Sequence, residues 1–243
     1  MERLIYTAVS GAELNNKALQ VVANNLANVS TSGFRADLEQ AQSMLVSGDG
    51  FRTRYQAQLM PVTTSLAAGP MMETGRKLDI AMSDNGYLAV EDANGEEAYT
   101  RAGNLMVDGQ GRLTVNGMQV IGNEGPIQLQ QYGDIDISPD GTINLTPVGG
   151  GLIAQDAQLK LVSTDNNFVK GQDGLLRATD GQPLNADPAV KVTTGKLEGS
   201  NVNAVAEMVR TMNISRQFEM NIKMMKMADE LAESGDRLVR GQS

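Results

Sequence analysis

The sequence contains no cysteine and no histidine among its 243 residues. Their absence excludes disulfide frameworks, thiol nucleophiles, zinc sites built from Cys and His, and serine triads that need an imidazole base. A strongly basic face is also missing, because the net charge is −9, and this opposes nucleic-acid binding. We therefore expect no metal site, no cofactor and no nucleic-acid partner.

Aromatic residues and long apolar runs are also scarce. The chain has no Trp, four Phe and five Tyr, which leaves few stacking platforms for bases or sugars. No apolar run reaches the roughly 18 residues that a membrane-spanning helix needs. The first residues, 1–5, lack the basic and apolar regions of a cleaved secretory signal. We expect a protein that does not span a membrane and that, if exported, leaves by another route.

Two acidic patterns suggest chemistry and are better explained by turns. Carboxylate pairs can hydrolyse glycosidic bonds without histidine, but the candidates lie at expected strand ends: Asp84, Glu91, Asp92, Glu96 and Glu97. The run 134–141 resembles part of a calcium loop, yet Pro147 occupies the position of the required glutamate. A hairpin around Ser138–Gly141 is the preferred interpretation, and we expect no enzyme.

The N-terminal residues 1–33 have the period of an amphipathic helix. The spacing alternates between three and four, as in a coiled-coil seam, at Ile5, Ala8, Ala12, Asn15, Leu19, Val22 and Leu26. One seam position is polar, and a polar residue there often fixes register or partner number. The alternative interpretation of this stripe is a helix that packs on its own domain. We favour a helix–helix interface.

The C-terminal residues 196–243 predict a second helix. Its apolar positions are expected to form one stripe through Val202, Val205, Val209 and Met212, then Phe218, Ile222 and Met225, then Ala228 and Leu231. Five methionines crowd residues 212–227, and methionine adapts to irregular helix interfaces. Core filling is the ordinary alternative for any one of them.

Between the helices the sequence predicts mainly β structure. Residues 34–76 are expected to form an extended connector without a core of its own. Residues 77–195 contain many short apolar runs separated by Gly and Asn turns, which favour an antiparallel sandwich or barrel. The predicted class is α+β: a mainly antiparallel β domain flanked by terminal helices that form a coiled-coil layer on assembly.

Several strings resemble one protein family. The segment 23–34, Ala-Asn-Asn-Leu-Ala-Asn-Val-Ser-Thr-Ser-Gly-Phe, is similar to the N-terminal signature of the bacterial flagellar axial proteins, the rod and hook subunits. Residues 78–88 and 99–104 resemble that family's β domain. Residues 197–202, Glu207-Met208 and 216–219 resemble its C-terminal helix. The resemblance extends over most of the chain. A single modest β domain, unlike that of the longer hook subunit, and the strings 158–162 and 173–177 resemble a proximal rod subunit, with a distal rod subunit as the near alternative.

The resemblance implies a non-enzymatic building block of the flagellar basal body. It implies export by the flagellar type III apparatus, assembly with copies of itself and with neighbouring rod subunits, and transmission of torque across the periplasm. The asparagine amides are expected to bond to neighbouring backbones, and Gly33 to permit a left-handed turn. The implied assembly residues add to the two stripes Asn24, Asn25, Asn28, Gly33, Phe34, Asn201 and Met208. A surface adhesin with helical stalks is the alternative outside this family.

Overall fold

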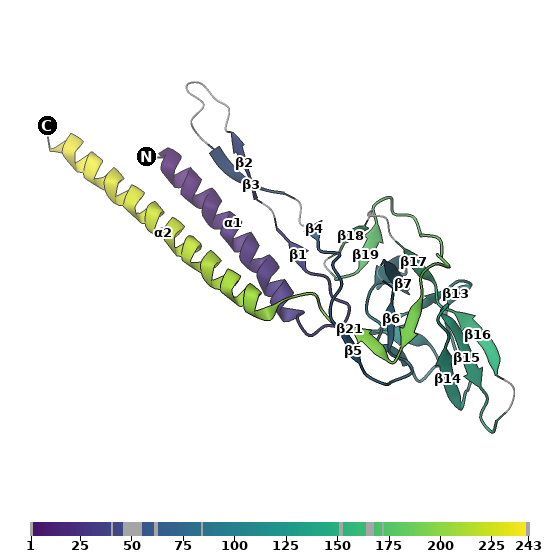
Figure 1. The fold of residues 1–243 in the computed structure, drawn as a ribbon. Helices are drawn as coiled ribbons and strands as arrows, with labels where there is room; N and C mark the ends of the chain where they lie inside the picture. Colours follow the sequence, from purple (N-terminus) through teal and green to yellow (C-terminus); the bar gives the residue numbers. More distant parts are fainter. Residues whose placement is uncertain are drawn as a thin grey trace. The chain divides into compact units, whose positions relative to one another are not determined.

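A computed structural model of the chain describes residues 2–39, 41–45, 55–60, 63–83, 85–150, 153–163, 168–171 and 173–241 (Figure 1). The chain divides into two compact units. The helical unit comprises Met1–Ala27, Asp37–Thr63 and Val202–Ser243, and the β unit comprises Asn28–Ala36 and Thr64–Asn201. Because each unit is assembled from separate stretches of the chain, contacts between residues far apart in the sequence stabilise each unit internally.

The helical unit is built on two helices that pack along each other, α1 (Glu2–Ala27) and α2 (Ala204–Arg240) (Figure 1). The strands of this unit are β1 (Asp37–Leu38), β2 (Ala41–Leu45) and β3 (Tyr55–Leu59), and β2 and β3 form an antiparallel hairpin. The side chain of Asn203 caps α2 by accepting a hydrogen bond from the backbone N–H of Ala206 at 3.1 Å. The helix starts immediately after this cap.

The β unit consists of short antiparallel strands. They are β5 (Met71–Glu73), β6 (Ile80–Met82), β7 (Gly86–Glu91), β8 (Glu97–Thr100), β9 (Leu105–Val107), β10 (Leu113–Val115), β11 (Met118–Gln119), β12 (Ile121–Gly122), β13 (Gly125–Pro126), β14 (Asp134–Ile137), β15 (Thr142–Thr146), β16 (Ala154–Gln158), β17 (Leu161–Ser163), β18 (Phe168–Lys170), β19 (Leu176–Ala178), β20 (Val192–Thr194) and β21 (Lys196–Glu198). A further short strand, β4 (Thr63–Thr64), lies at the boundary of the two units.

The largest sheet of the β unit has five strands in the order β17-β7-β8-β19-β18. The β unit also contains two three-stranded sheets, β14-β15-β16 and β11-β10-β9, and the strand pairs β12-β13, β20-β6 and β21-β5. The main core is formed by residues of these strands, among them Ile80, Leu88, Leu105 and Ile143, and by Leu159, which directly follows β16; all five are fully or almost fully buried. A smaller cluster surrounds Tyr99.

The α+β class and the mainly antiparallel β region are confirmed. The predicted hairpin at residues 135–145 is also confirmed, as β14 paired with β15. Two details differ. The first helix ends at Ala27 rather than near Gly33, and the stretch 34–76 contains the strands β1 to β5. Of the acidic residues weighed for catalysis, Asp84 lies outside the described residues.

One acidic candidate, Asp92, has a structural role in the β unit. Its carboxylate accepts hydrogen bonds from the Arg177 guanidinium at 2.6 Å and from the backbone N–H groups of Asn94 at 2.8 Å and Glu96 at 3.0 Å. The bond from Arg177, followed by those from the backbone, lowers the Asp92 pKa to about 2. The carboxylate thus closes a turn and ties it to β19.

The low pKa of Asp92 predicts an acid-dependent loss of stability. A depressed carboxyl pKa stabilises the fold above the unfolded value of about 3.9, and this contribution is lost as the pH falls through about 2. We expect Asp92→Asn to lower the free energy of unfolding by about 1 kcal/mol at pH 7, with a smaller effect at pH 2. Urea unfolding at both pH values measures this, and an equal loss at both would contradict it.

Candidate assembly surfaces and a buried charged junction

The predicted seam of α1 packs inside the helical unit. Ala8, Ala12 and Val22 are buried, and the other four seam positions, Ile5, Asn15, Leu19 and Leu26, are partly buried. A Cβ on Gly11 would lie 3.0 Å from the amide nitrogen of Asn221, so the backbone of α1 closely approaches α2 there. The chain's own elements therefore cover most of this seam.

The asparagines at the end of α1 differ in their roles. Asn25 is fully buried, and its amide makes two hydrogen bonds of 2.9 Å to the backbone N–H and C=O of Asp37. Asn24 is exposed and bonds the Asp37 carboxylate at 3.2 Å. Asn28 is partly buried, and its side-chain carbonyl accepts from the hydroxyl of Thr31 at 3.1 Å in the turn that follows the helix. These amides shape the end of α1 within the chain.

The predicted single stripe of α2 is wrong, because its residues divide between two faces. Phe218, Ile222 and Met225 are partly buried and Ala228 is fully buried, whereas Val205, Met208, Val209 and Met212 are exposed. In the first half of α2 the covered positions are Glu207, Thr211 and Ile214. The register of the stripe shifts between Met212 and Phe218, so α1 covers one row of α2 and leaves another uncovered.

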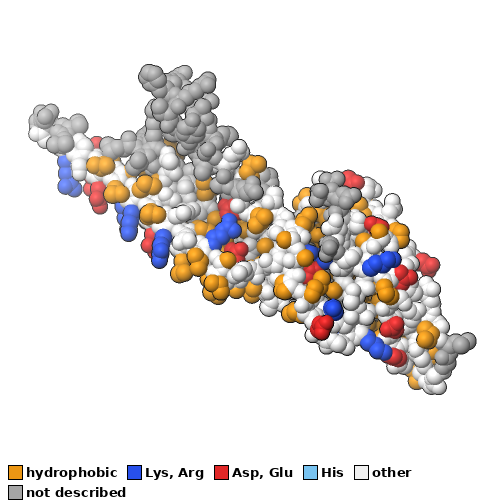
Figure 2. Space-filling model, viewed as in Figure 1, with side chains coloured by type: hydrophobic (Ala, Val, Ile, Leu, Met, Phe, Trp, Pro, Cys, Tyr) orange, Lys and Arg blue, Asp and Glu red, His pale blue; other side chains and the backbone are white. Residues whose placement is uncertain are grey.

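The uncovered row of α2 is apolar and, in its first half, uncharged. Val205 is 71% exposed and Met212 is 53% exposed, with Met208 and Val209 between them. Farther along, the exposed apolar residues Met220, Met224, Met227 and Leu231 alternate with charged side chains. Figure 2 shows hydrophobic side chains gathered along this edge of the helical unit. We call the four residues from Val205 to Met212 the α2 outer patch.

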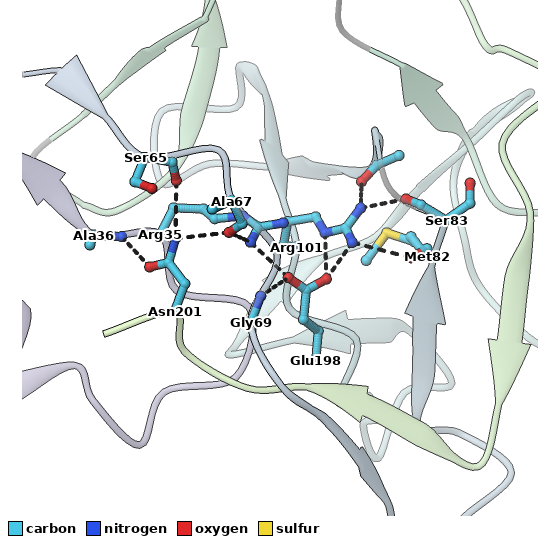
Figure 3. Close-up of polar contacts among 11 residues, drawn as sticks. Arg35, Ala36, Ser65, Ala67, Gly69, Met82, Ser83, Arg101, Glu198 and Asn201 are labelled. Atoms are coloured by element: carbon cyan, nitrogen blue, oxygen red, sulfur yellow. Dashed lines mark hydrogen bonds and ion pairs between the residues drawn. The ribbon is translucent and has the colours of Figure 1, made fainter. Parts of the chain in front are cut away.

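The β unit holds a buried charged junction, defined by Arg35, Arg101 and Glu198 (Figure 3). All three side chains are at most 3% exposed. Glu198 accepts from Arg101 Nε at 2.8 Å, from Arg35 Nη1 at 2.8 Å and from the backbone N–H of Gly69 at 2.9 Å. The carboxylate therefore bridges an N-terminal segment and a central one.

The two arginines of the junction are held unequally. Arg101 also donates to the backbone carbonyls of Met82, Ser83 and Gly86, so its guanidinium is fixed from several sides. Arg35 makes its described side-chain hydrogen bonds through Nη1, to Glu198 and to the carbonyl of Ala67. Burial is the main cause that lowers the Arg35 pKa, Arg101 adds to it, and the Glu198 carboxylate opposes it.

Asn201 ties the same segments together through its amide. Its Oδ1 accepts from the N–H of Ala36 at 2.7 Å, and its Nδ2 donates to the carbonyls of Ser65 at 3.2 Å and Ala67 at 2.9 Å (Figure 3). Its backbone N–H donates to the carbonyl of Phe34. Phe34 is buried, with Lys170 Nζ 3.8 Å from its ring centroid. The partly buried Val202 follows at the start of the helical unit.

Gly33 confirms the predicted left-handed turn, with φ of +69°. Its N–H donates to the carbonyl of Glu198 at 2.8 Å, and a Cβ at this position would lie 2.3 Å from the backbone nitrogen of Ala102. Glycine is therefore required both by the backbone conformation and by the close approach of a neighbouring chain segment.

Sequence reasoning did not assign roles to Arg35, Arg101 and Glu198, although the last two lie in strings quoted for the family resemblance. Their signal was the presence of charged residues within otherwise apolar or small strings far apart in the chain. Within the described residues, no group of three or more Asp or Glu side chains could hold a metal ion, and no described helix is long and apolar enough to cross a membrane.

Three segments of the chain match families of flagellar proteins, and these segments include the junction residues and the α2 outer patch. Residues 5–35 match the family described as flagella basal body rod protein, residues 81–145 match the D1 domain of the flagellar hook proteins FlgE, FlgF and FlgG, and residues 193–238 match the C-terminal region of the flagellar basal body rod proteins FlgE, FlgF and FlgG. The chain is 40% identical to the flagellar basal-body rod protein FlgF of Escherichia coli, over 98% of this chain and 99% of that protein. It belongs to the flagellar rod protein family.

Other members of the family give the same assignment. FlgF of Salmonella typhimurium is 38% identical over 95% of both chains, and FlgG of Agrobacterium fabrum is 31% identical over 95% of this chain. The protein is thus a structural subunit of the flagellar basal-body rod, not an enzyme, and it assembles with other rod subunits. FlgF is the better match and FlgG the runner-up.

Proposed function

We propose that this rod subunit polymerises through its terminal helices, with the α2 outer patch as a principal contact. The observation that carries the proposal is the uncharged apolar row Val205–Met212, which the chain's own α1 leaves exposed. A patch of this kind on a helix with a covered opposite face marks a surface that another protein covers. Helices of neighbouring subunits are the expected partners, because this is a rod subunit.

The proposed assembly makes a layer of helices within a shaft that transmits torque. Contacts between copies would be heterologous, head to tail around a helical axis, which lets a polymer grow without closing. Methionines suit this role, because one flexible side chain can pack against non-identical neighbours. Asn24 and the seam positions of α1 remain predicted assembly residues, although most of the seam already has partners within the chain.

We also propose that the subunit is proximal in the rod and is exported by the flagellar type III apparatus. The similarity to FlgF over nearly the whole chain supports the proximal position, and the absence of cysteine suits a chain that crosses a membrane unfolded. Deleting the export apparatus should retain the tagged subunit inside the cell. Its appearance in basal bodies of such a strain would contradict this route.

The polymerisation proposal predicts that Val209→Asp blocks incorporation into the rod. A buried, unpaired carboxylate costs several kcal/mol, enough to abolish a contact shared among many weak neighbours. Because Val209 is 47% exposed in the single chain, the free energy of unfolding of the purified subunit should change by less than about 0.5 kcal/mol. Immunoblots of purified basal bodies, together with swimming assays, measure incorporation.

The matched control is Gln217→Asp, which introduces the same charge at an exposed polar position of the same helix. Its subunit should be incorporated normally. Normal swimming with the Val209→Asp subunit present in basal bodies would contradict the proposed interface. A large loss of monomer stability in that variant would instead show that the patch belongs to the subunit's own fold.

A further inference from the structure

The segment through which the chain first enters the β unit is bonded to the segment through which it last leaves, although residues 37–63 between them belong to the helical unit. The N–H of Gly33 donates to the carbonyl of Glu198, and the N–H of Asn201 donates to the carbonyl of Phe34. Side chains reinforce this backbone pairing, because Arg35 forms an ion pair with Glu198 and Asn201 accepts from Ala36. The segments just after α1 and just before α2 are therefore fastened to each other inside the β unit (Figure 3).

This fastening changes the entropy of pairing α1 with α2. Roughly 180 residues separate the end of α1 at Ala27 from the start of α2 at Ala204, and a free chain of that length must be closed for the helices to meet. Once residues 33–36 are bonded to 198–201, only about ten residues of free chain remain in the loop. The effective concentration of one helix at the other falls with the 3/2 power of loop length, so the junction raises it about 70-fold.

We infer that Arg35 and Asn201 are positioning residues for helix pairing: they make the pairing of α1 with α2 conditional on a folded β unit. Arg101 and Glu198 already form a complete ion pair, so the β unit does not need Arg35 for its own charge balance. Arg35 instead connects the N-terminal segment to Glu198. The helices consequently pair after the β unit has folded.

The test uses the absence of cysteine in this chain. The double substitution Gly11→Cys, Asn221→Cys places one thiol pair across the helices, where a Cβ on residue 11 would lie 3.4 Å from Cγ of Asn221. The equilibrium constant for disulfide formation against glutathione then reports the effective concentration of the helices in the full-length chain. Any strain in the disulfide cancels in ratios between variants that share the same pair.

Into this background Arg35→Met and Asn201→Ala are introduced singly and together. While the β unit stays folded, Gly69 remains bonded to Glu198, so releasing the N-terminal segment lengthens the free chain from about ten to about 45 residues. We therefore expect the disulfide equilibrium constant to fall several-fold in the double variant, toward a limit of about 10-fold, and by less in each single variant. Near-ultraviolet circular dichroism of the buried tyrosines, Tyr87 and Tyr99, shows in the same samples that the β unit is folded. If the double variant unfolds the β unit, the disulfide equilibrium constants of the two single variants test the inference instead.

Glu97→Gln is the matched control, because it weakens a partly buried ion pair with Lys160 in the β unit, away from the chain's entry and exit. Its equilibrium constant should stay within twofold of the parent. An unchanged constant in the Arg35 and Asn201 variants with a folded β unit would overturn the inference. So would an equal fall in Glu97→Gln, since general destabilisation would then explain the result.

Discussion

Replacing Arg101 with methionine is expected to lower the free energy of unfolding of the β unit by about 3–5 kcal/mol. Breaking a buried ion pair by removing one partner leaves the other charge in a low-dielectric interior with too few partners. Here the substitution removes the Nε contact to Glu198 and also strands the carbonyls of Met82, Ser83 and Gly86. Urea unfolding followed by tyrosine fluorescence measures the change.

The control for this prediction is Arg112→Met. Arg112 forms an ion pair with Asp108 at 2.7 Å, but solvent screens this exposed pair, so its loss should destabilise the fold far less than the loss of Arg101. Similar losses for Arg101→Met and Arg112→Met would show that the buried junction is no more important than a surface pair. A loss confined to Arg101 supports its place as the anchor of the β unit.

The second large effect is expected for Gly33→Ala, at about 2–4 kcal/mol of the free energy of unfolding. Alanine at φ +69° is strained, and its Cβ would also lie 2.3 Å from the backbone nitrogen of Ala102. Backbone atoms cannot move aside as a flexible side chain can, so the pairing of Gly33 with Glu198 should loosen. Thermal unfolding by circular dichroism measures the loss.

Gly95→Ala separates the two causes, because Gly95 has φ of +83° but only the Glu91 carboxylate lies near the added Cβ, at 3.6 Å. This control should cost about 1 kcal/mol, the price of the backbone conformation alone. If both variants lose equally little, the close approach of Gly33 to its neighbour has no energetic consequence, and the tight turn alone explains the glycine.

Periodicity predicted both helices and the antiparallel β region, yet it could not decide which helix face would be covered. Apolar residues at helical spacing are expected to share one face of a helix. In α2, however, the apolar residues form two rows on different faces, and the sequence pattern did not separate these rows. Phe218 and Met225 lie on the covered row, and Val205 and Met212 lie on the exposed one. Only packing against α1 separated them.

The absence of cysteine and histidine, the terminal helices and the turn-rich middle followed from the sequence by itself, because they depend on composition and local spacing. The junction did not, since Arg35, Arg101 and Glu198 are brought together by contacts between residues up to 163 positions apart. Local spacing carries no information about such contacts. Tertiary structure decided that these charges are buried, that the two arginines share one carboxylate, and that α2 keeps one apolar row uncovered.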